Sequence, residues 1–187
     1  MSPFWWRLLR YLLNDRSAET SSTREDKADN RFRLVRSDLE GLDNDRLFEV
    51  VKDEVFNRHV DKDRPDRYEE PLRHLILLYS LHDQLMAGGW EHFLFSRYAG
   101  YFDHTYRALQ AAGLGEWTAI MDDIRQAFPR GKVPADLRER RHELERVIPL
   151  RHDDWDERLR RWNEWSEARE SYFRQKVVEY ARRHLIG

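Results

Sequence analysis

The chain has 187 residues, a length that fits one domain or one domain with an appended segment. Hydrophobic residues make up 40% and aromatic residues 13%, which is enough for one sizeable core and excludes a wholly disordered chain. Charged residues make up 36%, against roughly 25% in an ordinary globular domain, while glycine and proline are few. These values favour solvated helices, and a net charge of -2 gives neither a global basic nor a global acidic field.

Cysteine is absent, which excludes disulfides, thiolate zinc sites, iron–sulfur clusters and cysteine nucleophiles. The absence fits a cytoplasmic location. The apolar stretch from Phe4 to Leu13 is interrupted by Arg7 and Arg10 and is shorter than the about twenty residues that cross a bilayer. No cationic segment precedes it and no small-residue cleavage site follows it. We therefore expect no membrane span and no secretory signal.

The N-terminal region is predicted to be separable from the domain. Ser2 and Pro3 suit the start of a short amphipathic helix over 4–13, which makes residues 1–14 one segment. Residues 15–30 have no apolar periodicity and indicate a flexible linker, so the domain is predicted at 31–187. Because so short a helix is marginal alone, it must dock on this domain or on a partner subunit, and we expect a homodimer joined through it. The alternative is an interfacial membrane anchor.

The first part of the domain leads into its predicted core. Residues 31–36 are predicted to be briefly extended, and 37–40 have the form of a capping box. A helix is predicted from Asp45, followed by a charged loop over 61–68. The next helix, from Pro71 to Met86, is apolar nearly all the way round and is predicted to be the central core helix. The buried sides of the helix from Asp45 carry Leu47, Phe48, Val50, Val51, Val55 and Phe56.

A glycine pair, Gly88 and Gly89, is predicted to break the chain after the core helix, and a further helix is predicted from Trp90 to Gly100. Glycines permit positive φ and a close approach of two helices, while the aromatic residue after them packs the turn onto the core. We interpret the set Gly88, Gly89, Trp90 and Phe93 as a structural corner, with a ligand-binding notch as the alternative.

The remaining helices are predicted at 101–112 and 117–128, then at 137–148 with an end at Pro149. From Asp153 to the C-terminus the pattern predicts one long helix, or two with a break near 163–166. Neither a strand ladder nor an internal repeat is visible. The predicted fold class is all-α, a compact multi-helix bundle with an N-terminal amphipathic helix on a flexible linker.

Catalytic motifs are missing from the sequence: it has no phosphate-binding glycine loop, no nucleophile elbow and no zinc-binding His-Glu-x-x-His pattern. The adjacent acids at 122–123 and 153–157 fit helix starts better than a catalytic pair. Pairs of histidines, His74 with His82 or His92 with His104, could meet across packed helices, but half-buried packing is the favoured role. We expect no catalytic residue, no metal and no cofactor, with a helical enzyme or metal-binding domain that uses the histidines and carboxylates as the alternative.

Charge is distributed unevenly along the chain. The arginine-rich stretches at 138–141 and 158–162 are interleaved with acids at helical spacing, which predicts solvated, ion-paired faces and not a nucleic-acid site. The most acidic segment is 37–54. Its carboxylates are the candidates for binding a protein partner: Asp43, Asp45, Glu49, Asp53 and Glu54.

The segment from Leu81 to Ser96, together with Ala108 to Gly113, resembles the centre of a bacterial family otherwise of unknown function that includes a DNA-mimic protein. The family pattern is an apolar helix ending in Asn-Gly-Gly-Phe, then Gln, two aromatic residues and Asn, then an Ala-Leu helix. Here the glycine pair, the aromatic Trp90 and Phe93 match, whereas Ala87, His92 and Ser96 replace the polar residues. The match covers about 71–128, with a looser similarity in the last helix.

The resemblance implies an all-helical fold, and it carries no functional residue across by motif. A DNA mimic displays carboxylates where phosphates would lie, which in a nearly neutral chain requires a local acidic surface. We therefore expect a non-enzymatic interaction or regulatory protein that binds a protein partner, in the mimic case a basic DNA-binding protein, through acidic helix faces. Direct binding of nucleic acid is not expected.

Overall fold

The computed structural model of the chain describes residue 39 and residues 41–57, 61, 64–150 and 152–185, with the backbone alone at 57, 147–150, 152 and 153. This described part is all-α and contains no strand, as predicted. The predicted helix at 4–13, the homodimer contact assigned to it, the linker and the extended stretch at 31–36 lie outside it. The helices and short 3-10 turns (η) are α2 (Asn44–Asn57), η3 (Pro65–Arg67), α3 (Glu70–Phe95), η4 (Arg97–Tyr101), α4 (Phe102–Ala111), α5 (Gly115–Ala127), η5 (Pro129–Gly131), α6 (Leu137–Leu150), α7 (His152–Glu167) and α8 (Glu170–His184).

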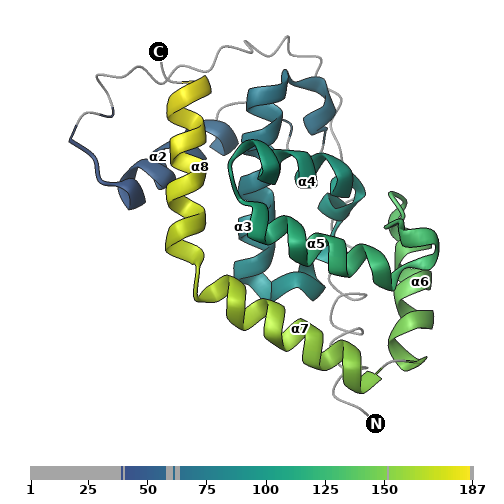
Figure 1. The fold of residues 1–187 in the computed structure, drawn as a ribbon. Coiled ribbons are helices and arrows are strands. Elements are labelled where there is room, and N and C mark those ends of the chain that lie inside the picture. The colour runs from purple at the N-terminus through teal and green to yellow at the C-terminus, as the bar shows by residue number, and fades with distance from the viewer. Residues whose placement is uncertain (1–38, 40, 58–60, 62–63, 151, 186–187) are drawn as a thin grey trace.

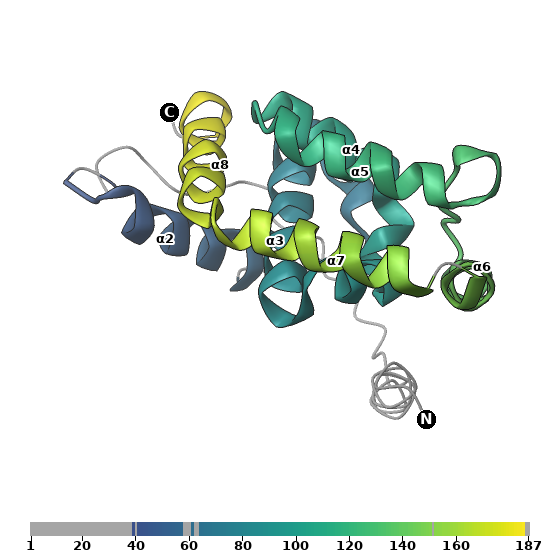
Figure 2. The ribbon, with the colours of Figure 1, turned by 60° about the horizontal axis from the view of Figure 1, so that its bottom comes forward.

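Helix α3 is the centre of the bundle and contacts α2, α4, α6, α7 and α8 (Figure 1). Its side chains are buried on nearly all sides, as the apolar pattern of this segment predicts. Helices α2 and α6 lie at opposite ends of the molecule, as Figures 1 and 2 both show. No helix of the described part is both long enough and apolar enough to cross a membrane.

The glycine pair kinks α3 as predicted. Gly89 has φ 73° and ψ -163°, a conformation that residues with a Cβ avoid. A Cβ at this position would also lie 2.3 Å from the side chain of Asn163 on α7. Asn163 instead accepts a hydrogen bond from the backbone N–H of Trp90 (2.9 Å), and the Trp90 indole donates to Ser166 (3.0 Å). The corner therefore seats α7 against α3.

The helix after the kink ends at Phe95, earlier than the predicted end at Gly100. Ser96 is extended, and its hydroxyl accepts a hydrogen bond from the backbone N–H of Tyr98. This cap starts the 3-10 turn η4 in place of a further helical turn. Phe93, the fourth residue of the predicted corner, packs edge-on against Trp90 and lies beside Phe102.

The last segment is two helices, and the break lies at Ala168 and Arg169, not near 163–166. Polar residues in that stretch suggest a break when read alone. In the structure, Asn163 and Ser166 lie inside α7 and bind Trp90, so they stay helical. The preceding helix, α6, runs to Leu150, one residue beyond its predicted end.

Arg140 corrects the prediction that the whole arginine-rich stretch of α6 is a solvated face. Its side chain is completely buried, and burial lowers its pKa to about 10. The guanidinium donates to the carbonyls of Leu94 (2.8 Å), in the last turn of α3, and of Ser96 (2.6 Å), directly after it. It also donates to the carbonyls of Pro134 and Ala135 before α6. Arg140 thus joins the C-terminal end of α3 to the start of α6.

Candidate protein-interaction site

Helix α2 carries three of the five predicted partner-binding carboxylates on its outer side. Leu47, Phe48, Val51 and Val55 are fully buried against the bundle. On the opposite side Asp45, Glu49 and Asp53 are exposed, and their four-residue spacing places them in one row along the helix. Glu54 is half-buried. Helix α2 itself lies at one end of the molecule (Figure 1).

Asp43 has a local role at the start of α2. Its Oδ1 accepts a hydrogen bond from the backbone N–H of Arg46 (2.8 Å), and its carbonyl accepts from the backbone N–H of Leu47 (2.9 Å). This is the geometry of a helix N-cap, which satisfies donors that the first turn leaves free. Asp43 is nevertheless exposed, so its carboxylate lies on the surface at the start of α2.

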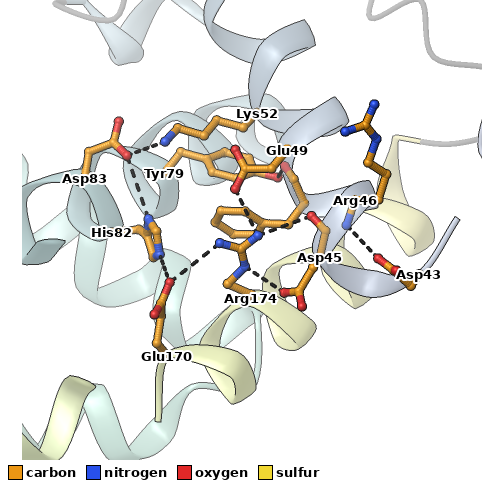
Figure 3. Close-up of polar contacts among 11 residues, drawn as sticks. Asp43, Asp45, Arg46, Glu49, Lys52, Tyr79, His82, Asp83, Glu170 and Arg174 are labelled. Carbon is orange, nitrogen blue, oxygen red and sulfur yellow. Dashed lines mark hydrogen bonds and ion pairs between the residues drawn. The ribbon is translucent and has the colours of Figure 1, made fainter. Parts of the chain in front are cut away.

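Arg174 of α8 binds the carboxylate row from the side of the bundle (Figure 3). Its guanidinium lies 3.0 Å from a carboxylate oxygen of Asp45 and 2.9 Å from one of Glu49. It also lies over the ring of Phe48, 4.4 Å from the centroid, and 3.6 Å from Glu170. The Arg174 side chain is only 17% exposed, whereas Asp45 is 76% exposed. Asp45 and Glu49 therefore pair with Arg174 and still face water.

A second polar tie joins α2 to α3. Lys52 donates to Asp83 at 2.5 Å, and the hydroxyl of Tyr79 donates to the backbone carbonyl of Phe48 at 3.1 Å. Burial opposes ionisation of Asp83, but Lys52 and the adjacent His82 outweigh it and lower the pKa of this carboxyl. The acidic helix is thus held by apolar packing along its inner side and by charged contacts along both edges.

His82 lies between these two ties. It is buried between the rings of Phe48 and Phe173, whose centroids lie 5.0 Å and 5.8 Å from its own. Its Nε2 lies 3.2 Å from a carboxylate oxygen of Glu170. Its Nδ1 lies 3.7 Å from Asp83 and makes no hydrogen bond. The charged contacts therefore form one network from α2 through α8 to α3 and back (Figure 3), made up of Asp45, Glu49, Arg174, Glu170, His82, Asp83 and Lys52.

The structure does not group the predicted histidines into a metal site. His74 lies two turns before His82 on α3, and its Nδ1 is 2.7 Å from the hydroxyl of Tyr180 on α8. His92 is half-buried, and His104 contacts Tyr101 edge-on. Across the described residues, no three histidine, aspartate or glutamate side chains are placed to hold a metal ion.

The alternative interpretation of the glycine corner as a ligand notch corresponds to a hollow beside the kink. It is lined by Leu85, Met86, Gly89, Asn163, Ser166 and Glu167. The polar groups of Asn163 and Ser166 are already engaged by Trp90. These two contacts support the interpretation of the corner as architecture.

Sequence patterns did not identify Arg174, Glu170 or Lys52 as partners of the acidic segment. Glu170 and Arg174 have the i,i+4 spacing of an ordinary ion pair within one helix. The contact of Arg174 with Glu49 spans 125 residues of chain, so no local pattern reveals it.

Comparison with known proteins assigns the chain to a family. The family model described as DMP19-like protein matches residues 66–184, which contain all helices from α3 to α8. The match includes the kinked helix α3, the glycine corner and the segment that carries Arg174, whereas α2 precedes it. Neither the comparison with curated proteins nor that with solved structures gave a match. On the family match, which covers more than half of its length, the chain belongs to the DMP19-like family, the DNA-mimic family that its sequence resembles.

Proposed function

We propose that this chain is a non-catalytic binding protein whose helix α2 presents a row of carboxylates to a basic, DNA-binding protein. The observation that carries the proposal is the row formed by Asp45, Glu49 and Asp53, exposed on one side of α2 in a member of a DNA-mimic family. In this proposal the chain acts in the cytoplasm, where its partner meets DNA.

The row of α2 carboxylates is a short, local line of negative charge. Residues four apart on an α-helix are separated by about 6 Å along its axis. One strand of duplex DNA carries a phosphate every 3.4 Å or so along the axis. A surface of this kind therefore offers a partner's lysines and arginines a sparser line of negative charge than DNA does. The nearly neutral net charge of the whole chain does not prevent this, because screening limits exposed charges to about 8 Å at physiological ionic strength.

The pairing with Arg174 is compatible with binding. Asp45 keeps 76% of its side-chain surface exposed to water, and Glu49 keeps 49%. A carboxylate has two oxygens and about four acceptor positions, so each can accept a second cation while it keeps the first. Arg174 thereby holds the acids in place and reduces the rotamer entropy that binding would otherwise cost.

The test is capture of DNA-binding proteins by the immobilised full chain from a bacterial lysate, followed by elution with double-stranded DNA of mixed sequence. We expect a basic protein that DNA displaces and that the triple variant Asp45→Lys, Glu49→Lys, Asp53→Lys no longer retains. The matched control reverses three exposed acids elsewhere, with Asp123→Lys, Glu145→Lys and Glu167→Lys, and should retain the partner. Retention by the α2 variant, with its fold verified by circular dichroism, would refute the proposal.

A further inference from the structure

We propose that the partner-binding surface extends from α2 along α3 to the glycine corner, where Met86 forms its apolar contact. The partner is then a basic protein that places an apolar side chain between its lysines and arginines. This proposal rests on the function proposed above and names a second element of the same surface.

The first step of the argument is the exposure of Met86. Among the residues whose side chains the structure describes, two large hydrophobic side chains are exposed, Met86 at 45% and Tyr172 at 42%. The Tyr172 ring stacks on Trp117 at a centroid distance of 6.2 Å, and the ammonium of Lys176 lies 5.5 Å from its centroid. Tyr172 therefore has aromatic and cationic neighbours in its own chain. A single exposed apolar side chain is ordinary on a protein surface, so the surroundings of Met86 decide its role.

The second step is the hollow beside the kink of α3. Met86 lines it together with the apolar Leu85 and the exposed Glu167. The polar groups of Asn163 and Ser166, which also line it, are engaged by the residue after the kink. What this part of the surface offers a partner is therefore an apolar side chain beside a carboxylate.

The third step connects Met86 to α2. Met86 follows Asp83 by three residues and His82 by four, so these side chains lie on one side of α3 within about one helical turn. Asp83 binds Lys52 of α2, and His82 faces Glu170 of α8 (Figure 3). The side chains of Asp83 and Glu170 are 42% and 37% exposed. The acidic surface therefore continues from α2 over Asp83 and ends beside Met86.

The fourth step concerns the chemistry of the partner. Carboxylates attract any polycation, and salt screens this attraction. An apolar contact adds affinity that does not depend on charge, and specific protein interfaces combine an apolar centre with a polar rim. Methionine suits such a contact because its side chain is flexible and polarizable. Met86 beside Asp83 and Glu167 thus fits a basic protein with an apolar side chain among its cations, in preference to a purely cationic one.

The test uses two short synthetic peptides with the same number of lysines, one with leucines between the lysines and one with glutamines in their place. Fluorescence anisotropy measures the binding of each labelled peptide to the full chain at physiological ionic strength. We expect the wild type to bind the leucine peptide about three- to tenfold more tightly, from burial of roughly half of a methionine side chain. Met86→Gln should abolish this preference, and Tyr172→Gln, at the other exposed hydrophobic side chain, should keep it.

The Met86 methyl resonance provides a measurement on the wild type itself. In a chain isotope-labelled at its methionine methyl groups, the leucine peptide should shift the NMR signal of Met86 and leave that of the buried Met121 unchanged. Equal affinity of the wild type for both peptides, the same preference in Met86→Gln, or an unmoved Met86 signal with the leucine peptide bound would each overturn the proposal. Failure of the proposed function has a different signature, since the triple variant at Asp45, Glu49 and Asp53 would then bind both peptides as tightly as the wild type does.

Discussion

Two arginines join helices in this molecule by opposite means. Arg140 is completely buried and donates to four backbone carbonyls between α3 and α6. Arg174 lies near the surface and pairs with side-chain carboxylates of α2 and of its own helix. Carbonyls neither titrate nor move away, whereas exposed carboxylates respond to salt, to pH and to competing cations. The α3–α6 junction is therefore fixed, and the α2 junction is adjustable.

The largest expected effect is at the fixed junction. Arg140→Met should lower the free energy of unfolding by about 3 kcal/mol or more, because it leaves several buried carbonyls without donors. Arg140→Lys should rescue only part of the loss, since one ammonium cannot reproduce the planar guanidinium. Denaturant unfolding measures both variants. A loss below about 1 kcal/mol for Arg140→Met would show that this junction is no firmer than the one at α2.

The glycine corner is the second fixed contact, and Gly113, with a similar φ, provides a comparison for it. Gly89→Ala should lower the free energy of unfolding by about 1 to 3 kcal/mol, from positive φ and from the clash with Asn163. Gly113 has nearly the same φ, 76°, but open space where a Cβ would lie. Gly113→Ala should therefore cost less, about 1 kcal/mol, because no atom lies where its Cβ would be placed. Equal losses in the two variants, measured by denaturant unfolding, would remove close packing against α7 from the explanation.

At the adjustable junction, Arg174→Met should lower the free energy of unfolding by about 1 kcal/mol in low salt. The methionine keeps packing against Phe48, so the loss reports mainly on charge. The difference from the wild type should shrink at about 1 M salt, where the screening length is about 3 Å. The cost of Arg140→Met should not shrink. As a matched control, Arg160→Met removes exposed ion pairs within α7 and should leave the free energy of unfolding nearly unchanged.

The smallest effect concerns pH. Burial lowers the pKa of His74, with partial opposition from Glu70, and burial also lowers the pKa of His92. The unfolded chain therefore binds protons more readily at both positions, so stability is full above about pH 6.5 and falls as the pH drops below it. Thermal unfolding across this range should show a shallower loss in His74→Gln than in the wild type. A steeper loss in the variant would reverse the assigned sign.

The same contrast explains which features were predictable from the sequence. The core helix α3 and the kink at Gly89 depend on local pattern and backbone freedom, so both were predicted correctly. The exposed row on α2 follows from helical spacing. Arg140 was predicted on a solvated face, because its carbonyl acceptors Leu94 and Ser96 lie 46 and 44 residues away and carry no side-chain signal.

The end of α7 was misplaced for a related reason. Asn163 and Ser166 are poor helix formers, and alone they indicate a break. Their bonds to Trp90, 73 and 76 residues away, offset that preference. The resemblance identified the family correctly, but it was placed at about 71–128, whereas the family model matches 66–184, and it did not indicate how α2 is held.

The most direct test of the central claim is the salt dependence of affinity for the DNA-displaceable partner. Binding of the wild type should weaken steeply as salt rises, because exposed carboxylates carry the contact. The triple variant at Asp45, Glu49 and Asp53 should lose affinity and show a much flatter slope. The control variant at Asp123, Glu145 and Glu167 should keep a slope close to that of the wild type. Equal slopes for the two triple variants would contradict the assignment of binding to α2.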